Sequence, residues 1–238
     1  MKTAVIIQAR MNSTRLPGKA VMELAGKPVL QHVIERCRRS NVDEVIVATC
    51  EPADEIHMIA TASGAKVYVG DENNVYKRVL DCAEYWDVDW MCEITSDCPT
   101  VDPKHITMLF DHCNGQYISN CFPRYLADGF DAQVYPVSML EKVDIINHNH
   151  VGWNIKQTLE NLNCRVRNIN HLYKSDRYYH PYLSTTLDYK EDYEVLKKIF
   201  EHFGHNKFTA EEVMEFLFRH PEITAINTHL HRKAPEEN

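Results

Sequence analysis

The sequence predicts an α/β protein with a Rossmann-like, three-layer fold, in which a mostly parallel sheet carries helices on both faces and a smaller, mixed lobe is appended. Strand and helix patterns alternate through the first 100 residues, and helical crossovers between strands give parallel pairing. Residues 3–8 form an almost continuous apolar run, which is typical of a strand buried on both faces. A chain of 238 residues is long enough for one such domain.

Apolar spacing and turn residues define the elements of the first half. Pro28 is predicted to open a helix. Proline is favoured at the first helical position, because an N–H there would have no partner within the helix. A later helix stops at Gly64, a residue suited to the left-handed conformation after a helix end. The predicted order is strand 3–8, helix 28–37, strand 45–49, helix 52–63, strand 66–69, helix 74–86 and strand 90–95. The loops that follow parallel strands then share one edge of the sheet.

The second half is less regular. An amphipathic helix ends at Gly204 and another precedes Pro221. The predicted order is helix 103–113, strands 116–120 and 133–135, helix 153–162, strand 183–188, helix 191–203 and helix 210–218, with frayed residues from Arg232 onward.

Composition excludes several classes of function. The 26 basic and 34 acidic residues give a net charge of -8 without a basic stripe, so we expect no nucleic-acid partner. No apolar run approaches the roughly 18 residues that a membrane helix requires. The eight cysteines form no C-x-x-C pair and the chain opens directly into a strand, so we expect reduced thiols and a cytoplasmic protein. The 13 histidines show no structural zinc pattern, which favours surface or core positions over metal binding.

A short polar loop with three cations follows the first strand directly. Arg10, Arg15 and Lys19 fall within residues 9–19, at the edge where a doubly wound sheet binds its ligand. This arrangement favours a polyphosphate site, although an ordinary basic surface turn has the same composition. The loop is neither a Walker loop nor a dinucleotide fingerprint, because it lacks both glycine patterns.

Four ordered segments, residues 8–19, 45–49, 70–78 and 94–103, resemble the cytidylyltransferases that activate acidic sugars, and most of all the branch named for spore coat polysaccharide biosynthesis protein F. The resemblance implies a nucleotidyltransferase that moves CMP from CTP to an acidic sugar, or to a related phosphate or phosphonate, for surface polysaccharide or glycoconjugate synthesis. It also implies release of pyrophosphate, dependence on Mg2+, and a homodimer. One domain would comprise a nucleotide-binding half (1–115), an acceptor and dimerisation lobe (116–190) and C-terminal helices (191–238).

The same resemblance assigns roles to individual residues. Lys19, Arg10 and Asp97 are expected to be catalytic. The expected nucleotide-binding residues are Ala9, Arg10, Ser13, Arg15, Lys19, Thr49, Arg78 and Asp97.

Two acids are expected to hold Mg2+, which prefers one or two carboxylates together with substrate phosphates. Asp97 follows an apolar strand, where it could also be a simple turn residue. Asp188 ends a late segment that resembles the one supplying the second ligand. Asp192, four residues on, is expected to be structural, as an acid in the first turn of a helix.

The expected acceptor-binding residues are Asp131, Gln133 and His150. Asp131 could equally serve a turn, and Gln133 replaces the glutamate usual in the family. Asn12 and Ser96 replace family glycines, and the segment 148–152 retains only part of a family motif. The acceptor could therefore be unusual.

Two other functions are compatible with the pattern. A nucleotide-sugar glycosyltransferase is suggested by Asp87-Val88-Asp89, although this motif precedes a strand and would lie at the wrong edge. The departures at Asn12, Ser96 and Gln133 suggest instead a non-catalytic nucleotide-binding protein.

Overall fold

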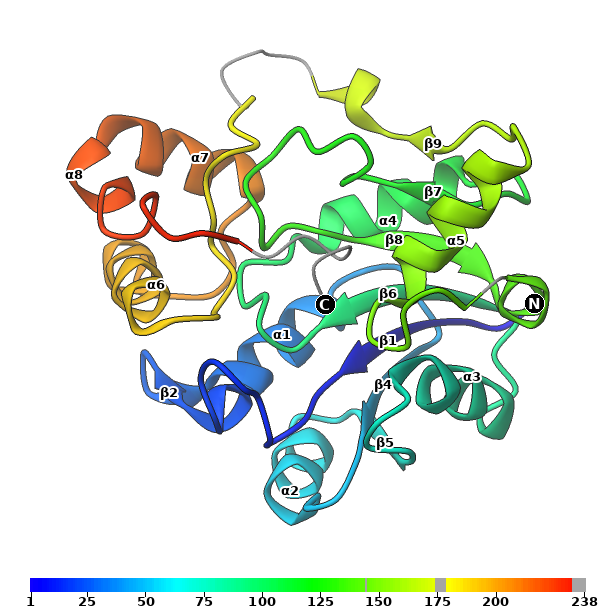
Figure 1. The fold of residues 1–238 in the computed structure, drawn as a ribbon. Coiled ribbons are helices and arrows are strands. Elements are labelled where there is room, and N and C mark those ends of the chain that lie inside the picture. Colours follow the sequence, from blue (N-terminus) through cyan, green and yellow to red (C-terminus); the bar gives the residue numbers. More distant parts are fainter. Residues whose placement is uncertain (144, 174–178, 233–238) are drawn as a thin grey trace.

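A seven-stranded mixed sheet forms the centre of the computed structural model, which describes residues 1–143, 145–173 and 179–232 (Figure 1). The strand order is β5-β4-β1-β6-β8-β7-β9. The parallel part comprises β1 (Thr3–Gln8), β4 (Glu44–Thr49), β5 (Lys66–Val69) and β6 (Trp90–Thr95). Strand β8 (Gln133–Pro136) pairs antiparallel with both β6 and β7 (Ile118–Ser119), and β9 (Arg167–Asn168) pairs parallel with β7. The predicted α/β, mostly parallel fold is confirmed.

Helices cover both faces of the sheet because consecutive side chains of each strand point to opposite sides. Val5 and Ile7 of β1 pack in one core with helices α1 (Val29–Cys37), α2 (Asp54–Ala62) and α4 (Pro103–His112). Ala4 and Ile6 of the same strand pack in a second core with α3 (Val75–Tyr85) and α5 (Val151–Asn161). The near-continuous apolar run of β1 is therefore explained by burial on both faces.

A third core joins the C-terminal helices to an N-terminal hairpin. The helices are α6 (Lys190–Phe203), α7 (Ala210–Arg219) and α8 (Pro221–Thr224), which gather on one side of the molecule (orange to red in Figure 1). The hairpin pairs β2 (Glu23–Leu24) with β3 (Lys27–Pro28). Three short 3-10 helices complete the described elements: η1 (Lys19–Val21), η2 (Val137–Lys142) and η3 (Asn170–Leu172).

Glycine supports two of the predicted helix ends. Gly204 caps α6 with a φ of 66°, and Gly64 follows the end of α2 with a φ of 79°. Both angles lie in the left-handed region that glycine adopts without a Cβ penalty. Within the described residues all eight cysteines are free, and no helix there is both long and apolar enough to cross a bilayer.

Three details differ from the sequence predictions. Residues 183–188 are not a strand, because their backbone bonds go singly to the Asp128 loop and to the carbonyl of Asp97 rather than to a ladder. Pro28 lies just before α1, as its N-cap, and pairs with Glu23. Arg232 is not frayed, since its guanidinium pairs with a fully buried carboxylate, while residues 233–238 lie outside the described part.

Candidate active site

The loop after β1 folds back over the carboxyl edge of the sheet. The amide of Gly18 donates to the carbonyl oxygen of Met11 at 2.9 Å, and the φ of Gly18 is 71°. This turn brings Lys19, at the start of η1, toward the end of β6. The opposite end of the loop is anchored by the amide of Ala9, which donates to Ala48 on β4.

A cleft of about 360 Å³ lies between this loop, the end of β6 and the starts of α3 and α5. It is lined by Gln8, Ala9, Arg10, Ser13, Thr14, Arg15, Lys19, Val75, Arg78, Thr95, Ser96, Asp97, Asn149 and His150. The lining contains every residue predicted to bind the nucleotide except Thr49. That residue is fully buried at the end of β4, where its hydroxyl donates to the neighbouring Cys50 carbonyl.

Two acids that are far apart in the sequence meet at Lys19. The Nζ of Lys19 lies 2.5 Å from Oδ2 of Asp97 and 2.8 Å from Oδ1 of Asp188. A second cation, Arg15, contacts the other oxygen of Asp188 at 2.7 Å. The structure therefore brings together the predicted catalytic lysine and both predicted metal ligands, although Asp188 does not itself line the cleft.

In this cluster the neighbouring opposite charges together shift the pKa values more than burial does. Burial disfavours the charged form of Lys19, but Asp97 and Asp188 raise its pKa above the usual value. Burial likewise opposes ionisation of Asp188, but Lys19 and Arg15 hold its pKa below the usual value. Arg15, Lys19 and Asp188 are thus charged at neutral pH.

The other side of the cleft carries positive charge with less compensation. The side chain of Arg78 is 1 % exposed, and its Nη1 donates to the carbonyl oxygen of Asp71 at 2.6 Å. Its Nε has no hydrogen-bond partner among the described residues. Burial lowers the pKa of Arg78, and the nearby cation Arg10 lowers it further. Two like charges at a cleft favour an anionic ligand between them.

The predicted acceptor residues differ in their position relative to the cleft. His150 lines the cleft as the N-cap of α5. Gln133 lies on β8, where its Oε1 accepts the hydroxyl of Tyr117 at 2.7 Å. Asp131 forms a two-pronged ion pair with Arg124, outside the lining.

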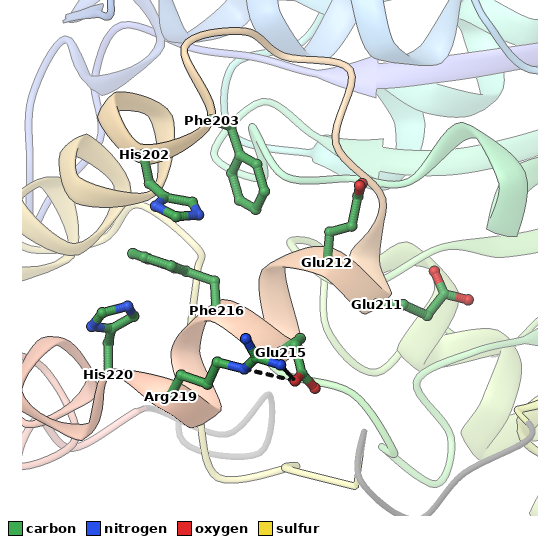
Figure 2. Close-up of a pocket in the computed structure, with 8 residues that line it drawn as sticks. All are labelled: His202, Phe203, Glu211, Glu212, Glu215, Phe216, Arg219 and His220. Atoms are coloured by element: carbon green, nitrogen blue, oxygen red, sulfur yellow. Dashed lines mark hydrogen bonds and ion pairs between the residues drawn. The ribbon is translucent and has the colours of Figure 1, made fainter.

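A second, larger pocket of about 540 Å³ lies between α6 and α7 (Figure 2). Glu211, Glu212 and Glu215 line it, and its one lining arginine, Arg219, is paired with Glu215 at 2.6 Å. A triphosphate would meet repulsion at this rim, so size alone does not make it the nucleotide site.

The glycosyltransferase motif lies at the opposite edge of the sheet. Asp89 immediately precedes β6, and its Oδ2 accepts the amide of Lys2, the residue before β1. Asp87 and Asp89 therefore flank the amino ends of the strands, away from the cleft.

A family model described as Cytidylyltransferase matches residues 4–223. The chain belongs to the cytidylyltransferase family. It is accordingly a CTP-dependent nucleotidyltransferase, as the resemblance predicted.

Individual relatives extend this result. A solved cytidylyltransferase from Leptospira borgpetersenii superposes with a TM-score of 0.86 at 30% identity, covering 97% of this chain and 100% of that one. Spore coat polysaccharide biosynthesis protein SpsF of Bacillus subtilis is 28% identical over 91% of this chain and 94% of its own. The 3-deoxy-manno-octulosonate cytidylyltransferase of Coxiella burnetii is 35% identical over 52% of each chain.

Sequence reasoning missed a buried polar network beneath the cytidylyltransferase cleft. Glu93 on β6 is 8% exposed and accepts hydrogen bonds from Nε2 of Gln8 at 2.7 Å and from the hydroxyl of Tyr135 at 2.8 Å. Burial raises the pKa of Glu93. A charged residue in the middle of an apolar strand was the available signal, because such a residue needs buried partners.

Proposed function

We propose that this cytidylyltransferase transfers CMP from CTP to an acidic sugar, or to a related phosphate or phosphonate, with the help of Mg2+. The observation that carries the proposal is the meeting of Lys19 with Asp97 and Asp188 at one end of a cleft that also presents Arg10 and Arg78. The names of the Bacillus and Coxiella relatives support an acidic sugar acceptor and a place in surface polysaccharide synthesis.

The reaction forms a bond between an acceptor oxygen and the α-phosphorus of CTP. The bond from this phosphorus to the bridging oxygen breaks, pyrophosphate leaves with the electron pair, and the acceptor hydroxyl loses its proton. The obstacle is charge, because the triphosphate repels an anionic acceptor and the leaving group gains negative charge. Catalysis then consists mainly of positioning and electrostatic stabilisation.

The cations of the loop meet this requirement. Arg10, Arg15 and Lys19 would bind the β- and γ-phosphates, and the hydroxyl of Ser13 would donate to a phosphate oxygen. Arg78 would lie near the nucleotide and Ala9 near the base. The approach of Thr49 to the base would be through its backbone, since its side chain is buried.

The two carboxylates fit a hard cation. Asp97 and Asp188 supply oxygen ligands beside a phosphate site, which is the ligand set that Mg2+ prefers. When bound, Mg2+ would neutralise phosphate charge and polarise the phosphoryl group. On the acceptor side His150 is the predicted residue that lines the cleft, while Gln133 and Asp131 would act from its margin.

Pyrophosphate release tests the proposal. Each of the four nucleoside triphosphates is incubated with Mg2+ and a panel of acidic acceptors, including a 3-deoxy-octulosonate, a nonulosonate and small phosphonates. We expect release with CTP and one acceptor class, and none for Asp97→Ala despite an unchanged circular dichroism spectrum. Release from a different triphosphate, or undiminished turnover in Asp97→Ala, would contradict the proposal.

The homodimer and the cytoplasmic location remain part of the proposal. Light scattering of the purified full chain measures the first, and fractionation of the source cells measures the second. If the active protein had the mass of a monomer, the proposed homodimer would be wrong.

A further inference from the structure

Three potential metal ligands meet between α4 and α7, away from the cleft. Asp102 is the N-cap of α4, His105 lies in its first turn, and Glu211 lies in the first turn of α7. One ligand atom from each side chain lies within 4.8 Å of the other two. None of the three lines the nucleotide cleft.

The imidazole ring at the centre of this cluster is buried without a hydrogen-bond partner among the described residues. Asp102 and His105 are each 1% exposed. Neither ring nitrogen of His105 has a hydrogen-bond partner among the described residues, and the same holds for Oε2 of Glu211. An unsatisfied buried polar group destabilises the folded state. Such groups are rare in native proteins and call for an explanation, of which a bound ion is one.

The two carboxylates are held in place and keep free lone pairs. Oδ1 of Asp102 accepts the amide of Lys104 at 2.8 Å, and Oδ2 accepts the amide of Ala210 at 2.6 Å. Oε1 of Glu211 accepts Nζ of Lys104 at 3.2 Å, which leaves Oε2 available. Each carboxylate oxygen has capacity for a second partner, so these bonds orient the acids as outer-shell contacts orient metal ligands.

Glu211 is the ligand nearest the protein surface. Its side chain is 28% exposed, whereas the other two ligands are enclosed. Figure 2 shows the Glu211 carboxylate turned away from the rings of His202, Phe216 and His220. The ligand cluster is therefore separate from that ring cluster.

We propose that Asp102, His105 and Glu211 bind a zinc-class divalent cation that joins α4 to α7. One imidazole with two carboxylates suits Zn2+, Co2+ or Mn2+ better than Mg2+, which prefers oxygen ligands throughout. A neutral imidazole is the form that ligates a metal. The ion would stabilise the packing of the C-terminal helices on the sheet domain. The site is independent of the proposed catalytic Mg2+.

Zinc titration of the full chain tests this site. Protein stripped with EDTA is dialysed into buffer with excess Mg2+ and titrated with Zn2+ against a chromophoric chelator, with thermal unfolding recorded in parallel. We expect one tight Zn2+ per chain and a rise in the unfolding temperature. Co2+ should give visible absorption bands of a site that includes nitrogen.

Matched variants assign the ligands. His105→Gln and Glu211→Gln should each weaken Zn2+ binding at least about 100-fold, since even outer-shell changes cost 10–100-fold. His112→Gln, at the exposed end of the same helix, and Glu215→Gln, one turn along α7, should bind as the wild type does. Asp97→Asn should also retain the site. Glu211 is partly exposed, so Glu211→Gln should stay folded if His105→Gln does not.

Unchanged Zn2+ affinity in folded Glu211→Gln, or no binding by the wild type below millimolar Zn2+, would overturn the proposal. An unfolding temperature that Zn2+ raises equally in Glu211→Gln would also overturn it. Pyrophosphate release under excess Mg2+ should be unaffected by Glu211→Gln. A failure of the zinc site is therefore distinguishable from a failure of the proposed transferase activity.

Discussion

Replacing Lys19 by methionine separates two roles of the cluster that it forms with Asp97 and Asp188. Its ammonium lies 2.5 and 2.8 Å from the two carboxylates that are proposed to hold Mg2+. In the absence of nucleotide, these carboxylate oxygens are therefore paired with the lysine ammonium, which competes with a metal ion for them. We expect the wild type to bind a divalent cation weakly until CTP arrives, because the phosphates can then take over the lysine.

The loss of stability expected for Lys19→Met follows from the burial of the three side chains. The side chains of Asp97 and Asp188 are 20% and 14% exposed, and that of Lys19 is 11% exposed. Removing one partner of a fully buried ion pair costs about 3–5 kcal/mol. Because this pair is partly exposed, we expect Lys19→Met to lower the free energy of unfolding by about 3 kcal/mol. A cation that binds only the folded variant, at 100 times its Kd, would restore about 2.7 kcal/mol. Added Mn2+ should thus return most of the lost stability to the variant.

Urea unfolding and Mn2+ electron paramagnetic resonance, both without nucleotide, measure the two quantities. The control is Lys27→Met, which removes a more exposed lysine paired with Glu35 and should leave Mn2+ binding unchanged. Lys19→Met should bind Mn2+ at least about tenfold more tightly than the wild type, a difference of about 1.4 kcal/mol, while losing turnover. Equal Mn2+ affinity in Lys19→Met and wild type would refute the reasoning.

Three further substitutions test other parts of the structure. Arg36 is fully buried and donates hydrogen bonds to four backbone carbonyl groups. Arg36→Met should therefore lower the free energy of unfolding by at least about 3 kcal/mol in urea titrations, and a loss under about 1 kcal/mol would contradict this. Burial and the nearby Asp131 outweigh Arg124 and raise the pKa of Asp128 from 3.8 to about 6, so its stabilising contribution is complete below pH 3.8 and is lost as the pH rises through 6. The free energy of unfolding of Asp128→Asn, measured in EDTA, should therefore rise relative to that of the wild type by up to about 3 kcal/mol between pH 4 and 7. A difference between the two proteins that does not change with pH would argue against the raised pKa of Asp128. A Cβ at Gly152 would lie 2.1 Å from Oε1 of Gln133, so Gly152→Ala should cost about 1–3 kcal/mol and raise KM for the acceptor more than for CTP.

The sequence was most informative where local chemistry and strand pattern agree. The apolar run of β1 predicted a central buried strand, and the cations that follow it predicted a ligand edge. Both inferences need only neighbouring residues. The pairing of β8 against β6 was not predictable in the same way, because an antiparallel partner taken from the second half of the chain is chosen by tertiary packing.

Residues 183–188 show why one element was misassigned. Their apolar and β-branched composition is typical of a strand, yet their backbone bonds go to the Asp128 loop and to the carbonyl of Asp97 rather than to a ladder. Thr185 contributes its hydroxyl to this pattern, by hydrogen bonds to Thr100 and to the carbonyl of Asp128. Side-chain bonds of this kind offer the backbone an alternative to a ladder. Composition alone does not distinguish the two outcomes.

The buried clusters were out of reach for a different reason. Arg36 is bonded to carbonyl groups 64 to 172 residues away in sequence, and Glu211 meets His105 across two helices that are separated by most of the second half of the chain. No periodicity or short motif records such contacts. A histidine and an acid at a helix start are common, so only the folded structure reveals that both ring nitrogens lack hydrogen-bond partners within the described part of the chain.

Asp192 connects the C-terminal helices to the active-site cluster. Its Oδ2 accepts the amides of Asp188 and Tyr189, both at 2.9 Å, and so fixes the backbone that carries Asp188. Its Oδ1 accepts from Asn227 and Arg232, which makes the fully buried carboxylate a four-way junction. The position of Asp188 therefore depends on residues more than 30 positions further along the chain. The ligand role proposed for Asp188 therefore depends on the contacts of Asp192, since a metal ligand must be held by contacts beyond the ion.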